Sequence, residues 1–156
     1  MAIINVLRSS KLFSGLSESE LEKVASLSTE ETHSAGSTIA REGERARKLY
    51  ILKEGRVVLD IHIGHDPVRP ATRATVRVVD RLESFGWSAL VEPHVYTLSA
   101  ECTEGCKLVA IDGERLRGLI DADHDLGFRV MKRLAAVIAS RLRLTRHTLV
   151  TERVGR

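Results

Sequence analysis

The feature that most constrains the fold is a series of short β-prone runs in the middle of the chain, separated by glycines. The glycines lie at positions 36, 43, 55, 64, 86 and 105. The runs cover residues 31–33, 38–41, 48–53, 56–63, 74–79, 96–102 and 107–112. Many short strands at this spacing favour a β-sandwich, a roll or a barrel. Residues 65–73, which include Pro67 and Pro70, predict an exposed hairpin loop.

Helices are predicted on both sides of this β region. Ser17 and Glu20 have the spacing of a capping box, so a short helix should follow them and end near Leu27. An earlier turn is predicted over residues 3–9, a short helix over 113–120, and a long helix from about 123 to 149. We therefore expect one domain over 1–156, with a helical part at 12–30, a β-roll at 31–112, and a hinge with a long helix at 113–150.

The long C-terminal helix carries an apolar seam with 4-3-4-3-4 spacing, typical of a helix that pairs with another helix. The seam consists of Met131, Ala135, Ile138, Leu142, Thr145 and Leu149. A second stripe consists of Val130, Leu134, Val137 and Leu144. Two stripes favour one contact with the β body and one with the same helix of a second subunit, and we predict a homodimer. The alternative is a single wide face packed on the body.

Composition excludes several classes of protein. Hydrophobic residues make up 43% of the chain and charged residues 29%, as in ordinary soluble globular proteins. No apolar run approaches the ~18 residues of a membrane helix, and the N-terminus is too short and polar for a signal peptide. Cys102 and Cys106 make no disulfide framework. We expect a cytoplasmic protein with no membrane partner.

Positive charge is concentrated at the C-terminus. Eight Lys and Arg residues and one acidic residue follow Phe128, although the whole chain carries a net charge of +3. Such a helix could contact nucleic acid phosphates directly. Basic side chains near a helix end are more often solvated and complement the helix dipole. We therefore do not expect this chain alone to bind DNA.

Three segments resemble the cyclic nucleotide-binding domain, the sensor part of catabolite-activator and Fnr-type regulators and of cyclic nucleotide-regulated kinases and channels. LFSGLSESELEKVASLS is similar to the first helix, AGSTIAREGERARKLYILKEGRVVL to the first strands, and KLVAIDGERLRGLI to the last strand and hinge helix. The resemblance covers nearly the whole chain. It implies a mainly β fold, a double-stranded β-helix or jelly roll of eight strands, with a short N-terminal and a long C-terminal helix.

The most specific likeness is SFGWSALVEPHVYTLSAEC at residues 84–102, which matches the phosphate-binding cassette of that family. In the family a Phe-Gly turn leads into a helical turn whose free N–H groups face the anion. An acidic residue after the glycine holds the ribose hydroxyl, and a later arginine pairs with the cyclic phosphate. The resemblance implies these ligand-binding residues here: Phe85, Gly86, Trp87, Ser88, Ala89, Leu90, Tyr96 and Thr97.

Both defining side chains of the cassette differ in this sequence. Trp87 occupies the position of the acid, Tyr96 that of the arginine, and Leu82 that of a turn glycine. Removing one partner of a buried charge pair costs roughly 2–5 kcal/mol, or ~30-fold to several thousand-fold in affinity. Cyclic AMP or cyclic GMP is thus the only cofactor-like ligand that the resemblance implies, and we expect it to bind weakly.

The sequence leaves two interpretations of Trp87 and Tyr96 open. Their side chains either fill the old pocket and close it, or line a site for a different, less charged or aromatic effector. Ser88, Thr97 and backbone N–H groups could still hold an anion weakly. His94, Arg73 and Arg77 are candidate substitutes for the missing cation.

No catalytic residues are predicted, because the chain has no G-x-S-x-G, P-loop or H-E-x-x-H motif, and we do not expect an enzyme. A cupin-like metal site is the rival interpretation. His62 and His65 are three apart, which would place them on opposite faces of a strand, whereas Asp60 and His62 share a face that looks solvated. We predict no metal.

The predicted function is a stand-alone regulatory or sensor module that binds a small effector and signals through its C-terminal helix. Movement at a hinge near residues 118–125 would change the position of that helix. Two alternatives stay open: a ligand-free protein-interaction or scaffold domain, and the sensor fragment of a Crp/Fnr-type transcription regulator without its helix-turn-helix.

Overall fold

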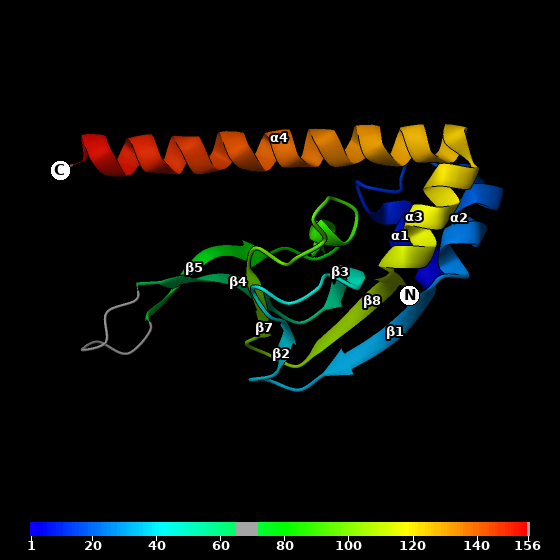
Figure 1. Cartoon of the computed structure of the whole chain (residues 1–156). Coiled ribbons are helices and arrows are strands. Elements are labelled where there is room, and N and C mark those ends of the chain that lie inside the picture. Colours follow the sequence, from blue (N-terminus) through cyan, green and yellow to red (C-terminus); the bar gives the residue numbers. More distant parts are fainter. Residues whose placement is uncertain (65–71, 156) are drawn as a thin grey trace.

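A computed structural model describes residues 1–64 and 72–155 of the chain (Figure 1). Two helices, α1 (Ile3–Ser9) and α2 (Glu18–Ala25), precede the strands, and α3 (Gly113–Ala122) and α4 (His124–Val154) follow them. The strands are β1 (Ser28–His33), β2 (Thr38–Ala40), β3 (Lys48–Glu54), β4 (Val57–Ile63), β5 (Thr72–Val79), β6 (Ser84–Phe85), β7 (Ser99–Cys102) and β8 (Cys106–Asp112). A 3-10 turn, Trp87–Ala89, lies between β6 and β7.

The strands form two four-stranded sheets, with the orders β1-β8-β3-β6 and β2-β7-β4-β5, and neighbouring strands in each sheet are antiparallel. This confirms the predicted β-roll with flanking helices. The centre of the first sheet lies in the core, and five consecutive residues of β3 are buried there. Tyr50 of β3 pairs with Phe85 of β6, and their rings stack with centroids 5.2 Å apart.

The N-terminal helices close one end of the roll. The predicted capping box is present: Ser17 accepts from the Glu20 N–H at 3.3 Å, and the Glu20 carboxylate accepts from the Ser17 N–H at 2.9 Å. The helix ends at Ala25, slightly earlier than expected. Leu7 and Phe13 are fully buried against the core.

The first part of α4 is packed into the core of the body. Asp123 caps its first turn, and its buried residues are Leu126, Gly127, Val130 and Leu134. A Cβ at Gly127 would lie 2.6 Å from the Ile120 carbonyl oxygen, so the contact of α3 with α4 requires glycine there. Figure 1 shows the rest of α4 running straight across the roll toward the β4–β5 hairpin.

Several local expectations were wrong. The run at 96–102 becomes a strand only from Ser99, and β6 was not among the predicted strands. The helical turn that the resemblance implies after Gly86 is present as the 3-10 turn. Asp60 is not solvated: it is 6% exposed and accepts from the Thr75 hydroxyl at 3.1 Å. The register shifts between Leu59 and Asp60, as at a β-bulge, so both adjacent residues are buried.

The expected hairpin loop at 65–73 falls mainly outside the described residues, and its end at Thr72 and Arg73 belongs to β5. Across residues 1–64 and 72–155, no helix is both long and apolar enough to cross a membrane.

Candidate effector-binding site

One wall of a pocket is formed by β6 and the turn that follows it. Gly86 has a left-handed backbone with φ of 76°. A Cβ at this position would lie 3.2 Å from the Lys48 carbonyl oxygen and 3.3 Å from the Tyr96 ring. The turn therefore needs glycine both for its backbone conformation and for this close approach.

The 3-10 turn begins with unused backbone donors. The Ala89 N–H donates to the Gly86 carbonyl at 3.1 Å, and the Leu90 N–H to that of Trp87 at 2.8 Å. The N–H groups of Trp87 and Ser88 have no acceptor among the described residues. First N–H groups of a helical turn are commonly left free in this way, and they favour negative charge nearby.

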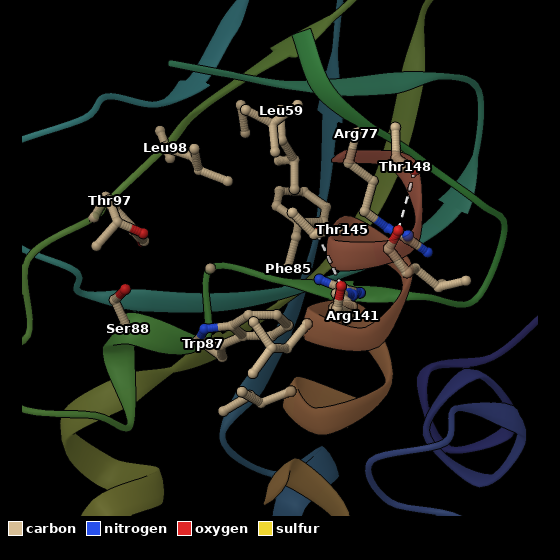
Figure 2. Close-up of a pocket in the computed structure, with 18 of the residues that line it drawn as sticks. Leu59, Arg77, Phe85, Trp87, Ser88, Thr97, Leu98, Arg141, Thr145 and Thr148 are labelled. Atoms are coloured by element: carbon tan, nitrogen blue, oxygen red, sulfur yellow. Dashed lines mark hydrogen bonds between the residues drawn. The ribbon is translucent and has the colours of Figure 1, made fainter. Parts of the chain in front are cut away.

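Trp87 joins this wall to α4. The Arg141 guanidinium lies over the indole ring, with 4.5 Å between Cζ and the ring centroid. This is a cation–π contact between two elements far apart in the sequence. Figure 2 shows Trp87 at the edge of the pocket, with Arg141 reaching it from α4.

Tyr96 has a structural role at the position expected for an arginine. It is 7% exposed, and its hydroxyl donates to the Lys48 carbonyl at 2.6 Å and accepts from the Lys48 N–H at 3.3 Å. Burial raises the pKa of Tyr96 above its ordinary value, so the phenol stays neutral. The side chain that lines the pocket at this position therefore carries no charge.

The pocket itself has a volume of about 540 Å³ and lies between the cassette, the second sheet and α4 (Figure 2). Its lining is mainly apolar, which is typical of small-molecule sites. The sheet and cassette contribute Ala40, Leu59, Val76, Arg77, Phe85, Gly86, Trp87, Ser88, Tyr96, Thr97, Leu98 and Ala100. Helix α4 contributes Ile138, Arg141, Leu142, Leu144, Thr145, Thr148, Leu149 and Glu152.

Charge in the pocket is concentrated where β5 and α4 approach each other. Glu83 accepts from Arg77 Nη2 at 2.7 Å and from Arg141 Nη2 at 3.2 Å. Arg141 Nη2 also donates to the Ser84 carbonyl at 2.6 Å. Burial, together with the nearby Arg77, lowers the pKa of Arg141 to about 10, although Glu83 opposes this shift.

The structure brings most of the cassette residues together around the pocket. Of the eight residues named from the sequence, Ala89 and Leu90 do not line it, because they are buried in the core beneath the turn. Whether the other six bind a ligand stays a prediction. Among the candidate cations, Arg77 lines the pocket, Arg73 pairs with Glu101 instead, and the His94 ring lies 3.1 Å from the Ser88 carbonyl.

The predicted helix seam divides into two parts. Ile138, Leu142, Thr145 and Leu149 line the pocket of their own chain, whereas Met131 and Ala135 do not and are exposed. Leu142 and Leu149 are still 48% and 49% exposed, so the seam is not fully used within one chain. Pairing of this seam with a second copy stays a prediction.

Sequence reasoning missed Arg141. Arg141 occupies the position of the second apolar stripe between Val137 and Leu144, and this interruption was the available signal. Within the ranges that the structure describes, no three His, Cys, Asp or Glu residues are grouped as metal ligands would be, and His65 lies outside those ranges.

Residues 30–123 match the family model of the cyclic nucleotide-binding domain. Among curated proteins, the cGMP-dependent protein kinase of Eimeria tenella is 32% identical over 108 residues, which is 68% of this chain. The chain spans only 10% of the length of that kinase.

Two solved structures have the same fold. A candidate cyclic nucleotide-binding protein from Geobacter metallireducens is 32% identical, with a TM-score of 0.77 over 91% of this chain and 99% of that one. The catabolite activator protein of Thermus thermophilus is 27% identical, with a TM-score of 0.72 over 91% of this chain and 62% of that one.

Proposed function

Because the chain belongs to the cyclic nucleotide-binding domain family, we propose that it is a regulatory module whose small effector binds between the cassette and α4. We propose that α4 transmits the signal. One observation carries this proposal: the same pocket is lined by the cassette on one side and by α4 on the other. A ligand that contacts both walls changes the free energy of α4 docking, provided that its affinity differs between the docked and undocked states.

The packing of α4 supports a signal in its distal half. Leu126, Val130 and Leu134 anchor the beginning of the helix in the core. From residue 135 to the end of the described helix no residue is buried. Asp123, which separates α3 from α4 and caps α4, is the natural hinge for a change in helix direction.

The cassette supports a weak site for cyclic nucleotides. Position 87 offers an indole in place of a carboxylate, and position 96 a phenol whose hydroxyl is bonded to Lys48. The free N–H groups of the turn, Ser88 and Thr97 remain available to an anion. We therefore expect dissociation constants for cyclic AMP and cyclic GMP toward millimolar, roughly 30-fold or more weaker than a micromolar site.

The experiment uses Trp87, the only tryptophan of the chain, as an internal reporter. Its emission is recorded while the protein is titrated with cyclic AMP, cyclic GMP and a panel of small metabolites. Thermal midpoints and hydrogen exchange of residues 138–152 are measured in parallel. An effector should raise the midpoint and alter exchange in α4.

Ala100→Phe, checked by circular dichroism, is the control, because Ala100 lines the pocket and a phenyl ring there would fill it. The ligand effect should disappear in this variant. If a ligand binds the wild type but leaves exchange in α4 unchanged, the signalling role of α4 is wrong. If no compound raises the midpoint or alters exchange in α4, the effector proposal is wrong, and a ligand-free interaction domain replaces it.

A further inference from the structure

Two arginines in the pocket share one carboxylate. Arg77 reaches the pocket from β5 and Arg141 from α4, and Glu83 pairs with both. The other acidic lining residue, Glu152, is exposed and lies three turns farther along α4, about 16 Å from position 141. Among the described residues, this end of the pocket therefore has one positive charge in excess.

Neither arginine is freely solvated. The side chains of Arg77 and Arg141 are 26% and 14% exposed, and that of Glu83 is 20% exposed. Charges removed from water are costly unless they are paired. The depressed pKa of Arg141 has the same physical origin, since burial and Arg77 both disfavour its charged form. A second anion at this place would relieve the imbalance.

Both guanidinium groups retain unused donors. Among residues 1–64 and 72–155, Arg141 donates to protein acceptors only through Nη2, and Arg77 only through Nε and Nη2. Nε and Nη1 of Arg141, and Nη1 of Arg77, have no acceptor among the described residues. The planar guanidinium group is suited to bind a carboxylate or phosphate through such donors.

The rest of the pocket is suited to an apolar body. Leu59, Phe85, Leu98, Ile138 and Leu142 line it. Two hydroxyl groups close to the arginines are already engaged as donors, Thr145 to the Arg141 carbonyl at 2.9 Å and Thr148 to the Leu144 carbonyl at 3.1 Å. Figure 2 shows Arg77, Arg141, Thr145 and Thr148 on one side, with Ser88 and Thr97 on the opposite side.

We propose that the effector is an apolar small molecule with one anionic group, and that Arg77 and Arg141 bind this group. The inference rests on the proposed function and names the chemical class of its ligand. Because Arg77 belongs to the roll and Arg141 to α4, the anion would bridge the two elements. A ligand of this class holds α4 against the roll.

The test compares acids with alcohols of the same carbon skeleton. Octanoate and octan-1-ol supply an acyl body, and 3-phenylpropanoate and 3-phenylpropan-1-ol an aromatic one. Binding is followed by Trp87 emission and by hydrogen exchange of residues 138–152. In the wild type, the preferred acid should bind at least about 10-fold more tightly than its alcohol. The acid that binds more tightly shows whether the apolar part of the effector is acyl or aromatic.

Arg77→Gln is the main variant, because Arg77 lies on β5 and the substitution changes no residue of α4. It should weaken binding of the acid about 10- to 100-fold and that of the alcohol little. Arg73→Gln is the matched control on the same strand, since Arg73 pairs with Glu101 and does not line the pocket. This variant should bind the acid like the wild type.

The outcomes separate the two proposals. If the alcohols bind as tightly as the acids, or if Arg77→Gln binds the acid normally, the anionic class is wrong while the effector pocket stands. If neither pair binds but a compound without an anionic group does, the anionic class alone again falls. If no compound perturbs Trp87 or α4, both proposals fall.

Discussion

The Arg141 guanidinium is stacked on the Trp87 ring at 4.5 Å and donates to the Ser84 carbonyl at 2.6 Å. These contacts join the exposed half of α4 to the cassette. Most of the other side chains of α4 beyond residue 138 are exposed, so this single residue provides much of the specific attachment. The side chain that holds the helix in place therefore also faces the effector pocket.

Arg141→Gln should loosen α4. The variant loses the stacking contact and at least one charged hydrogen bond, and we expect unfolding free energy to fall by about 1–3 kcal/mol. Hydrogen exchange of residues 138–152 should become faster, and Trp87 emission should change. Arg143→Gln is the control, because Arg143 is exposed on the same helix. Equal exchange in the two variants would contradict a role of Arg141 in docking.

Gly55 and Gly36 provide a matched pair for a stability test. Both have positive φ, 94° and 87°. A Cβ at Gly55 would lie 2.2 Å from the Gly105 carbonyl oxygen, whereas one at Gly36 would meet nothing within 4 Å. We expect Gly36→Ala to cost about 1–2 kcal/mol and Gly55→Ala at least about 3 kcal/mol in urea unfolding. Similar losses would show that the β7–β8 turn can move away.

Local patterns predicted the order of elements well. The capping box at Ser17 and the turn glycines act within a few residues, so the sequence contains their whole cause. Leu82 also fits this reasoning. It occupies the place of a family glycine and has φ of 69°, the left-handed conformation that the turn requires.

Long-range features could not be predicted in the same way. The burial of Asp60 depends on a register shift against β5, and periodicity within β4 alone indicates the opposite. Arg141 contacts Ser84, which is 57 residues earlier, and no spacing rule connects them. Tyr96 lines the pocket, but its bond to Lys48 depends on how β3 passes beneath the cassette.

The ionised Glu20 carboxylate should contribute to the free energy of unfolding, and this contribution should be lost at acid pH. Burial alone would raise the pKa of Glu20, but hydrogen bonds from Ser17 and Arg129 outweigh it, and the pKa lies below its usual value of 4.5. A depressed carboxyl pKa stabilises the fold above the unfolded pKa, and this contribution is lost as the pH falls through the folded pKa. When the pH is lowered below about 4.5, the free energy of unfolding in urea should fall less for Glu20→Gln than for the wild type.

Glu22→Gln is the control on the same helix, because Glu22 is exposed. It should follow the wild-type pH dependence. If Glu20→Gln also follows the wild type between pH 5 and pH 3, Glu20 is not responsible for the acid sensitivity of the α2–α4 contact.

The predicted dimer can be tested at Leu142. This residue is 48% exposed on the seam, and a carboxylate there would be removed from water if two seams paired. We expect the wild type to sediment as a dimer and Leu142→Asp as a monomer. Ser140→Asp, an exposed substitution on another face of α4, should remain dimeric. A dimeric Leu142→Asp variant, or a monomeric wild type, would show that the seam is wrong.

Replacing the two divergent cassette residues should restore tight binding of cyclic nucleotides. The double variant Trp87→Glu with Tyr96→Arg supplies a carboxylate for the ribose and a cation for the phosphate, and cyclic AMP affinity should rise about 30-fold or more by calorimetry. The loss of the Tyr96 bonds to Lys48 should cost about 1–2 kcal/mol, so circular dichroism must confirm folding. The uncharged pair Trp87→Gln with Tyr96→Met should gain nothing. A folded charged variant without improved affinity would mean that positions 87 and 96 are not the ones that determine nucleotide binding.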